Sequence, residues 1–208
     1  MQIKMKKLAA VTLVELLAVL AIMGVVTALT LPGLKKHSQK SEYAALAQKG
    51  FVTLEHAIDM ASAENEKEIG EINDGEIGQA GSLLLQKYLK KYMNYAKDCS
   101  ASWTNKNECL VSYIPFNGGT KVTPTIRAVI LMGGVVVAGR GAGDGQYSFI
   151  IDVNADAPPN REGVDVFLFN YRKYNANCEA DAANGQWKLC PAEHAKNLME
   201  DGWRINYW

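Results

Sequence analysis

The clearest hydrophobic pattern in the chain is an unbroken apolar run near its N-terminus. Residues 8–34 contain a single ionisable side chain, Glu15, and three lysines precede them. An α-helix rises about 1.5 Å per residue, so this run reaches roughly 40 Å and is long enough to cross a bilayer. The lysines predict that the residues before the apolar run stay on the cytoplasmic side and that the chain beyond Lys35 lies outside that membrane. We therefore expect a single-pass membrane helix.

Two common N-terminal signals explain this run less well. A secretory signal peptide has a shorter apolar core that ends at a cleavage site of small residues, whereas here the run passes through Pro32 into a helix-compatible segment. A generic signal anchor does not explain Glu15, because a carboxylate inside a membrane helix costs about 2.5–3.5 kcal/mol on insertion scales. No Lys or Arg lies within the run to pair with it. We expect either a partner from outside the chain or a protonated acid in the monomer.

From Lys35 onward the apolar positions narrow to one stripe at helical spacing. The stripe consists of Tyr43, Leu46, Ala47, Phe51, Leu54, Ile58 and Met60. It predicts that the membrane helix continues and packs this stripe onto a globular head. Residues 64–81 are acidic and glycine-rich and predict a solvated connector. A second helix is expected from Ser82, as N-cap, to Ala96.

The pattern then changes to that of strands. Four segments are rich in β-branched and aromatic residues, namely 109–116, 125–132, 135–139 and 147–153. Gly133 and Gly134 favour a tight hairpin between two of them. A last helix is expected over residues 192–201, with Pro191 at its start, Gly202 as its C-cap, and Trp203 and Trp208 as packing anchors beyond it. The predicted fold class is α+β: a long N-terminal helix packed on an antiparallel sheet.

Charge and motifs exclude several classes of function. The chain has 22 basic and 22 acidic residues, and the three lysines and one acid before Lys35 leave 19 basic and 21 acidic residues in the head. A surface for nucleic acid needs a basic excess, so we expect no nucleic-acid partner. The glycines of residues 139–145 do not have the spacing of a nucleotide-binding loop, and no P-loop, G-x-S-x-G or H-E-x-x-H motif occurs. We therefore predict that the chain is not an enzyme.

The four cysteines form two local pairs, Cys99 with Cys109 and Cys178 with Cys190. Neither pair has the spacing of a zinc site. We predict two disulfide-closed loops, each contributing about 2–4 kcal/mol, in an oxidising compartment. Four free cysteines in a cytosolic domain are the alternative.

One loop carries candidate metal ligands. Three oxygen-bearing side chains alternate and two more follow: Asp152, Asn154, Asp156, Asn160 and Asp165. Alternation of this kind opens many Ca²⁺ loops. The loop is not an EF-hand, because it lacks Gly at the sixth position and has Gly163 where a bidentate Glu is required. The alternative is an Asx-rich turn before two prolines, which the same residues favour.

Residues 10–32 resemble the class III signal of type IV pilins and type II secretion pseudopilins. The stretch from Thr12 to Leu17 matches that signal in order, and Gly24 and Pro32 lie where the family often has a helix-loosening Gly and a kinking Pro. The resemblance implies that a prepilin peptidase removes a leader of residues 1–10 by cutting between Ala10 and Val11, and then methylates the new amine. Ala10 replaces the usual Gly, and Val11 the usual Phe or Met, so we expect slower processing.

The same resemblance implies a role for Glu15 and a place for the chain. Glu15 would pair with the N-terminal amine of a neighbouring subunit, which sets the register of assembly because an unpaired charge in an apolar core is expensive. Residues 11–34 would form the transmembrane and filament-core helix, and residues 35–208 a periplasmic head of pilin-like fold.

The expected function is that of a structural subunit, a pseudopilin or pilin of a type II secretion or type IV pilus system. It would form homo- or hetero-oligomers with pilin-like subunits, using an assembly platform in the bacterial inner membrane. Residues 152–167 resemble a turn of pseudopilin-like proteins, whose major members bind Ca²⁺, and this slightly favours type II secretion. The alternatives are a minor pilin that acts as a tip adhesin or binds DNA or a substrate, and a membrane-anchored enzyme.

Overall fold

The structure is a computed structural model that describes residues 12–71, 81–99, 112–123, 126–140, 147–155 and 157–206. The chain divides into two compact units, Met1–Lys40 and Ser41–Trp208. The α+β class predicted from the sequence is confirmed: a long N-terminal helix is followed by a six-stranded antiparallel sheet.

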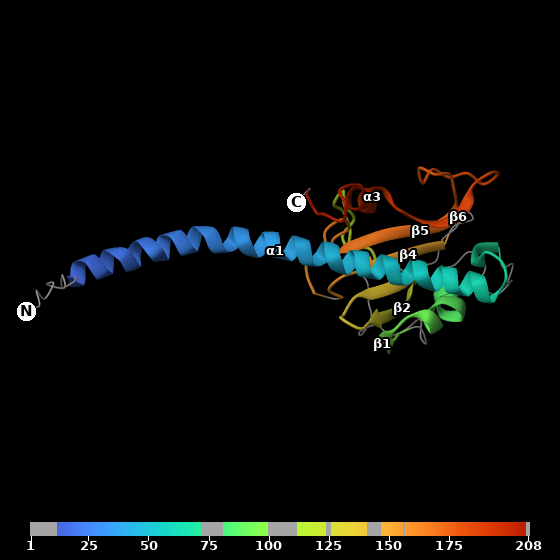
Figure 1. Ribbon diagram of the computed structural model, residues 1–208, viewed down its shortest axis with the longest axis horizontal. Helices are drawn as coiled ribbons and strands as arrows, with labels where there is room; N and C mark the ends of the chain where they lie inside the picture. Colours follow the sequence, from blue (N-terminus) through green and yellow to red (C-terminus); the bar gives the residue numbers. More distant parts are fainter. Residues whose placement is uncertain are drawn as a thin grey trace, which may run out of the picture. The chain divides into compact units, whose positions relative to one another are not determined.

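The elements follow one another in a simple order (Figure 1). The long helix α1 spans Leu13–Glu64 and is followed by a 3₁₀ turn, Ile69–Glu71. Next come α2 (Gly81–Leu84), a π-helical turn (Leu85–Leu89) and a 3₁₀ turn (Lys90–Tyr92). The strands are β1 (Tyr95–Asp98), β2 (Ile126–Leu131), β3 (Val136–Arg140), β4 (Tyr147–Asp152), β5 (Val166–Tyr174) and β6 (Gln186–Pro191), and α3 spans Glu193–Glu200. Strand order in the sheet equals chain order, so every connection joins neighbours.

One face of the sheet packs on the part of α1 that belongs to the head. The helix lies directly on β4, because a Cβ atom at Gly50 would come within 2.7 Å of a methyl carbon of Ile151. Next to it, the ring of Phe51 lies 5.1 Å from that of Phe169 and 5.5 Å from that of Trp203. The predicted stripe therefore forms the main core, with one exception: Met60 is 43% exposed.

The other face of the sheet carries a second, smaller core. It consists of Tyr113, Ala128, Val136, Ala138, Ile150 and Val166. Tyr113 lies outside the sheet, in segment 112–123, and brings that segment over the strands. Burial on both faces explains why the strands are apolar at successive positions instead of alternating with polar residues.

Several predicted boundaries were wrong. The second helix ends at Tyr92 instead of Ala96, because residues 95–98 pair with β2. Ser82 is buried inside α2 and is not an N-cap. The described residues of segment 109–116 form only isolated bridges, through Tyr113 and Ile114. Strands β1, β5 and β6 were not predicted.

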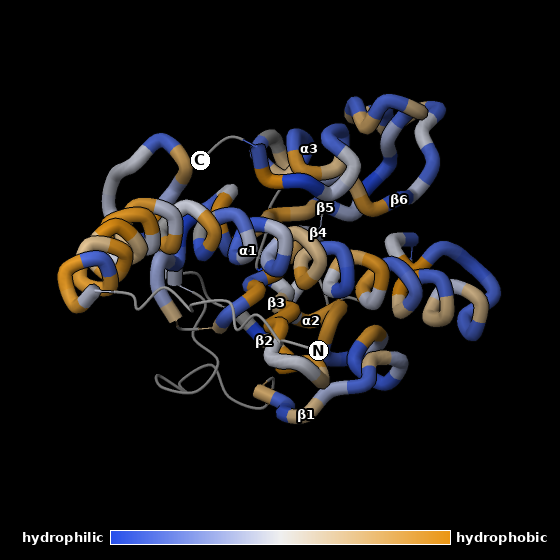
Figure 2. Tube along the Cα trace, turned by 60° about the vertical axis from the view of Figure 1, so that its left-hand side comes forward, coloured by the Kyte–Doolittle hydropathy of each residue, from blue (hydrophilic) through white to orange (hydrophobic). Residues whose placement is uncertain are grey.

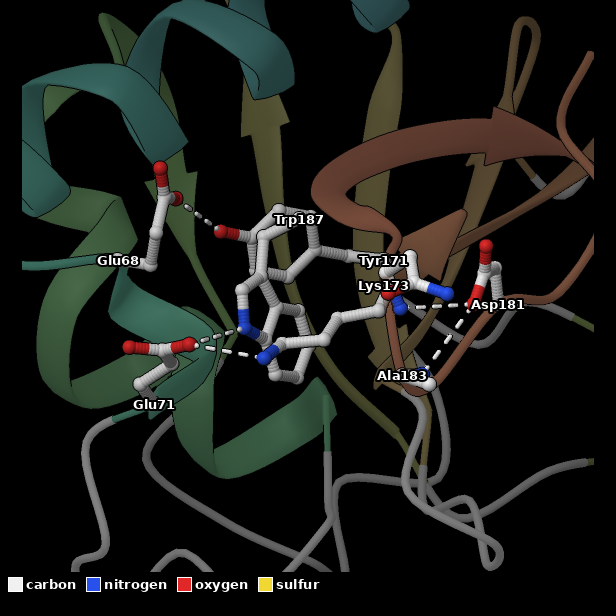
Figure 3. Close-up of polar contacts among 8 residues, drawn as sticks. Glu68, Glu71, Tyr171, Lys173, Asp181, Ala183 and Trp187 are labelled. Atoms are coloured by element: carbon white, nitrogen blue, oxygen red, sulfur yellow. Dashed lines mark hydrogen bonds and ion pairs between the residues drawn. The ribbon is translucent and has the colours of Figure 1, made fainter. Parts of the chain in front are cut away.

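The segment after α1 is fastened to the sheet rather than fully solvated (Figure 3). Ile69 is completely buried. The Tyr171 hydroxyl donates a hydrogen bond to Glu68 Oε2 at 3.1 Å, and Trp187 Nε1 donates to Glu71 Oε1 at 3.2 Å. A Cβ atom at position 70 would lie 2.4 Å from the Trp187 ring, so any larger residue there would require the ring to move. The connector predicted for residues 64–81 is therefore partly core.

The Tyr171 contact predicts a response to alkaline pH. Burial, followed by the nearby Glu68 carboxylate, raises the pKa of Tyr171 above its ordinary value. The folded chain therefore keeps this proton where an unfolded tyrosine, with a pKa of about 10, loses it. The resulting stabilisation is complete below about pH 10 and is lost as the pH rises further.

We expect Tyr171→Phe to lower the unfolding free energy by about 1 kcal/mol at pH 8. The same variant should lose less further stability than the wild type between pH 8 and pH 10.5, because the ionising group is gone. Urea unfolding of the detergent-solubilised chain at the two pH values measures both effects. Equal losses of unfolding free energy in the wild type and the variant would contradict the assignment of Tyr171 as the ionising group.

Candidate functional site

The first candidate site is the apolar half of α1. Its large hydrophobic side chains are exposed on every side of the helix, with exposed fractions from 50% at Val19 to 77% at Leu13 and Leu29. Figure 2 shows this half of α1 as a nearly continuous hydrophobic stretch. By length and composition the helix can cross a membrane. Such an apolar surface is more stable against lipid or other helices than in water, because hydrating it costs free energy.

Glu15 has a partner in its own chain that the sequence analysis missed. The Thr12 main-chain N–H donates to Glu15 Oε2 at 2.8 Å, and the Thr12 hydroxyl donates to the same oxygen at 2.9 Å. In return, the Glu15 N–H donates to Thr12 Oγ1 at 3.3 Å. This reciprocal pattern is a capping box, and its Thr-x-x-Glu signature is readable at residues 12–15. Glu15 thus has neutral donors within its own chain, and a cationic partner for its charge stays a prediction.

The capping box leaves Glu15 capable of a further interaction. Both donors from Thr12 bind the same carboxylate oxygen, Oε2, and no other hydrogen bond to the Glu15 carboxylate is found within the described part of the chain. A negative charge at a helix N-terminus is also favoured by the helix dipole. The site can therefore hold a carboxylate in the monomer while its second oxygen accepts a cation.

Other polar side chains in this half of α1 are satisfied locally. Thr27 Oγ1 donates to the Met23 carbonyl at 2.7 Å, and Thr30 Oγ1 donates to the Val26 carbonyl at 2.9 Å. These bonds let both hydroxyls lie in an apolar environment. The predicted processing residues, Ala10 and Val11, lie outside the described residues, so the cleavage bond stays a prediction.

The second candidate site is the loop between β4 and β5, where Asp165 is completely buried. Its Oδ2 accepts hydrogen bonds from the Asn160 N–H at 2.8 Å and from Asn154 Nδ2 at 3.2 Å, and its Oδ1 accepts one from the Arg161 N–H at 2.7 Å. Burial raises the pKa of the Asp165 carboxyl, and these hydrogen bonds offset part of that rise. Asp165 thus acts as the centre around which the loop folds.

The other predicted ligands support the same loop conformation. Asp152 Oδ1 accepts a bond from the Asn154 N–H at 3.1 Å, which is an Asx turn, and Asn154 Nδ2 also donates to the Tyr43 hydroxyl of α1 at 3.1 Å. Asp156 lies outside the described residues. Asp152, Asn154 and Asp165 therefore come together, and Asn160 joins them through its main chain.

The contacts of the Asp165 carboxylate are those of an Asx-rich turn, while Oδ1 of Asn154 in the same loop is buried without a hydrogen-bond partner among the described residues. A Ca²⁺ ion needs oxygen atoms directed at it, whereas the groups around Asp165 are N–H donors. Within the described ranges, no three His, Cys, Asp or Glu side chains are placed to hold a metal ion. The contacts favour the Asx-rich turn, and Ca²⁺ binding stays a prediction.

The disulfide predicted between Cys178 and Cys190 is present and ties the loop after β5 to β6. Cys99 is also disulfide-bonded. Its expected partner, Cys109, lies outside the described residues.

Asp165 offers a test that separates the turn from the metal. Asp165→Asn replaces one acceptor oxygen by an NH₂ group that faces N–H donors, and we expect a loss of about 1–2 kcal/mol in unfolding free energy. Asp181→Asn is the matched control, because only Oδ1 of Asp181 accepts the N–H groups of Ala183 and Asn184, and the variant keeps that oxygen. The wild type should melt at the same temperature in calcium chloride and in chelator. If calcium chloride instead raised the melting temperature of the wild type but not that of Asp165→Asn, the metal site would be established.

Comparison with known proteins found no matching family model, no matching curated sequence and no matching solved structure. The function of the chain is therefore inferred from its own residues and their geometry.

Proposed function

We propose that the chain is a structural subunit, a pseudopilin or pilin, of a bacterial type II secretion or type IV pilus system. The observation that carries the proposal is the composition of α1. An apolar half opens with the carboxylate of Glu15, and the same helix continues into an amphipathic half that packs on an antiparallel sheet. An ordinary membrane anchor needs that acid only as a helix cap, whereas a subunit that must find one register among identical apolar helices can also use its charge.

The proposed assembly proceeds without a large change in apolar burial. In the inner membrane the helix is surrounded by lipid, and in the filament by other helices, which are about as apolar. Packing and polar contacts must then decide how the helices align. Glu15 would receive the N-terminal amine of Val11 from a neighbouring copy at the oxygen that Thr12 does not use. The capping box holds the carboxylate until that partner arrives.

The remaining observations support a periplasmic head. The Cys178–Cys190 disulfide requires an oxidising compartment, such as the bacterial periplasm. The proposed partners are pilin-like subunits, the prepilin peptidase and the inner-membrane assembly platform. In this role the chain needs no catalytic group of its own.

Processing is the first test of this function. The mass of the intact chain extracted from membranes should correspond to loss of residues 1–10 and gain of one methyl group on Val11. The measurement is mass spectrometry of the whole chain, with fragmentation to locate the methyl group at the new terminus. A full-length chain that retains Met1 would count against the assembly function.

Glu15 is the second test, and the capping box makes it specific. Gln can replace Glu in a capping box, so Glu15→Gln removes the charge while keeping the local cap. We expect this variant to insert into membranes normally but to form no filaments, as Glu15→Val also should. Membrane fractionation measures insertion, and cross-linking of intact cells measures assembly. Normal assembly of Glu15→Gln would reduce the role of Glu15 to helix capping.

A further inference from the structure

The solvent-facing side of α1 in the head carries two neighbouring acids. Glu55 and Asp59 lie four residues apart, and residues 50–64 contain no Lys or Arg. Like charges at this spacing destabilise a helix. Neither side chain forms an ion pair or a side-chain hydrogen bond with any residue the structure describes. Partial burial and the charge of Asp59 raise the pKa of Glu55, which reflects the same unfavourable environment.

Exposed apolar side chains flank this acid pair. Val52 is 52% exposed and Met60 is 43% exposed. Among the described residues of the head, only Ile114 and Met132 are comparably exposed large hydrophobic residues. We call Val52, Glu55, Asp59 and Met60 the acidic α1 face. Unpaired charge combined with exposed apolar surface is typical of an interaction surface.

A second surface of the same chain has the complementary character. Residues 87–98 contain four lysines and one acid, interleaved with three tyrosines. The ammonium group of Lys91 lies 4.9 Å from the ring centre of Tyr92, and that of Lys87 lies 5.9 Å from the ring centre of Tyr88. We call these four residues the lysine–tyrosine surface. Lys91 already binds one acid at the end of α1, Glu64 of its own chain, so the surface accepts carboxylates of this helix.

We propose that the acidic α1 face of one copy docks on the lysine–tyrosine surface of a second copy. The proposal rests on the proposed function and names one subunit contact within it. Lysines would meet Glu55 and Asp59, and tyrosine rings would cover Val52 and Met60. The two surfaces lie on different elements of the head, α1 and the segment that leads from α2 to β1 (Figure 2). A contact between two different surfaces of identical chains does not close into a dimer and can propagate as a helix.

Other classes of binding partner would complement only one of the two surfaces. A nucleic acid would bind the lysines but would be repelled by Glu55 and Asp59. A metal ion would bind the two acids but would leave the lysines and tyrosines without a role. A second copy of this chain is the occupant that complements both surfaces at once.

Charge reversal tests the proposal in cells that make the full chain with its assembly system. One variant carries Glu55→Lys and Asp59→Lys, another carries Lys87→Glu and Lys91→Glu, and a third combines all four. We expect each reversal to lower the ratio of cross-linked oligomer to monomer about tenfold, and the combination to restore it. Lys196→Glu on α3 is the matched control, because it reverses an equally exposed charge outside both surfaces.

A single substitution separates assembly from stability. Glu55→Lys places a lysine four residues before Asp59, which replaces a repulsive pair by an attractive one. This variant should therefore melt at or slightly above the wild-type temperature and still assemble less well. On the other surface, Lys87→Glu alone leaves the Lys91–Glu64 pair intact, and its melting temperature is measured beside its assembly.

The outcomes distinguish this contact from the function on which it rests. If Glu15→Gln blocks assembly while the reversals at Glu55 and Asp59 have no effect, the contact is wrong and the function stands. Failure of the combined variant to recover would also overturn the contact, as would an effect of the lysine reversals alone, which would indicate a different partner for that surface. A wild-type chain that is unprocessed and monomeric would overturn both.

Discussion

Apolar surface must be removed from water, and α1 meets this constraint in two different ways along its length. Between Tyr43 and Ala61 the helix is apolar on one side, and the sheet of its own chain buries that side. Between Leu13 and Leu34 it is apolar all round, and its large hydrophobic residues stay exposed. The folded chain thus buries the apolar surface of its head but leaves the apolar surface of its first helical half exposed. In the proposed function, lipid would cover that half in the monomer and neighbouring helices would cover it in the assembly.

Within such a helix, polar groups matter because they are few. The hydroxyls of Thr27 and Thr30 are bonded to their own backbone and need nothing more. Glu15 differs, because a carboxylate bonded only by the neutral donors of Thr12 still carries its charge. The capping box lowers the cost of that charge without removing it, so a cation supplied by a neighbour would still be favourable. In the proposed assembly, local capping and pairing with a neighbouring subunit would be successive uses of this one side chain.

Sequence patterns predicted the parts of the fold that depend on local periodicity. The stripe from Tyr43 to Ile58 and the hairpin at Gly133 and Gly134 follow from spacing and turn chemistry, and both are present. Strand β1 was missed because "YAKD" has no strand pattern and forms only by pairing with β2. Ile69 looked like part of a solvated loop, but it is buried in a segment that distant Tyr171 and Trp187 bind through Glu68 and Glu71. At the candidate site, the Thr12–Glu15 capping box was readable from its spacing, whereas the three donors around Asp165 depend on how the loop folds.

The two proposed electrostatic contacts would contribute to assembly in different ways. A charge pair surrounded by apolar helices is hardly screened by salt, and leaving either ion unpaired there is costly. Glu15 can therefore decide whether a subunit is accepted at a given height. Glu55 and Asp59 lie at the surface, where an exposed pair contributes only about 0–1 kcal/mol and weakens with ionic strength. Such contacts are too weak to hold a filament together alone. Repeated along the filament, however, they can determine which surface of each head contacts the next head. A strong contact would fix the register of the apolar halves, and weak contacts would fix the orientation of the heads. Together they would specify one helical arrangement of identical chains.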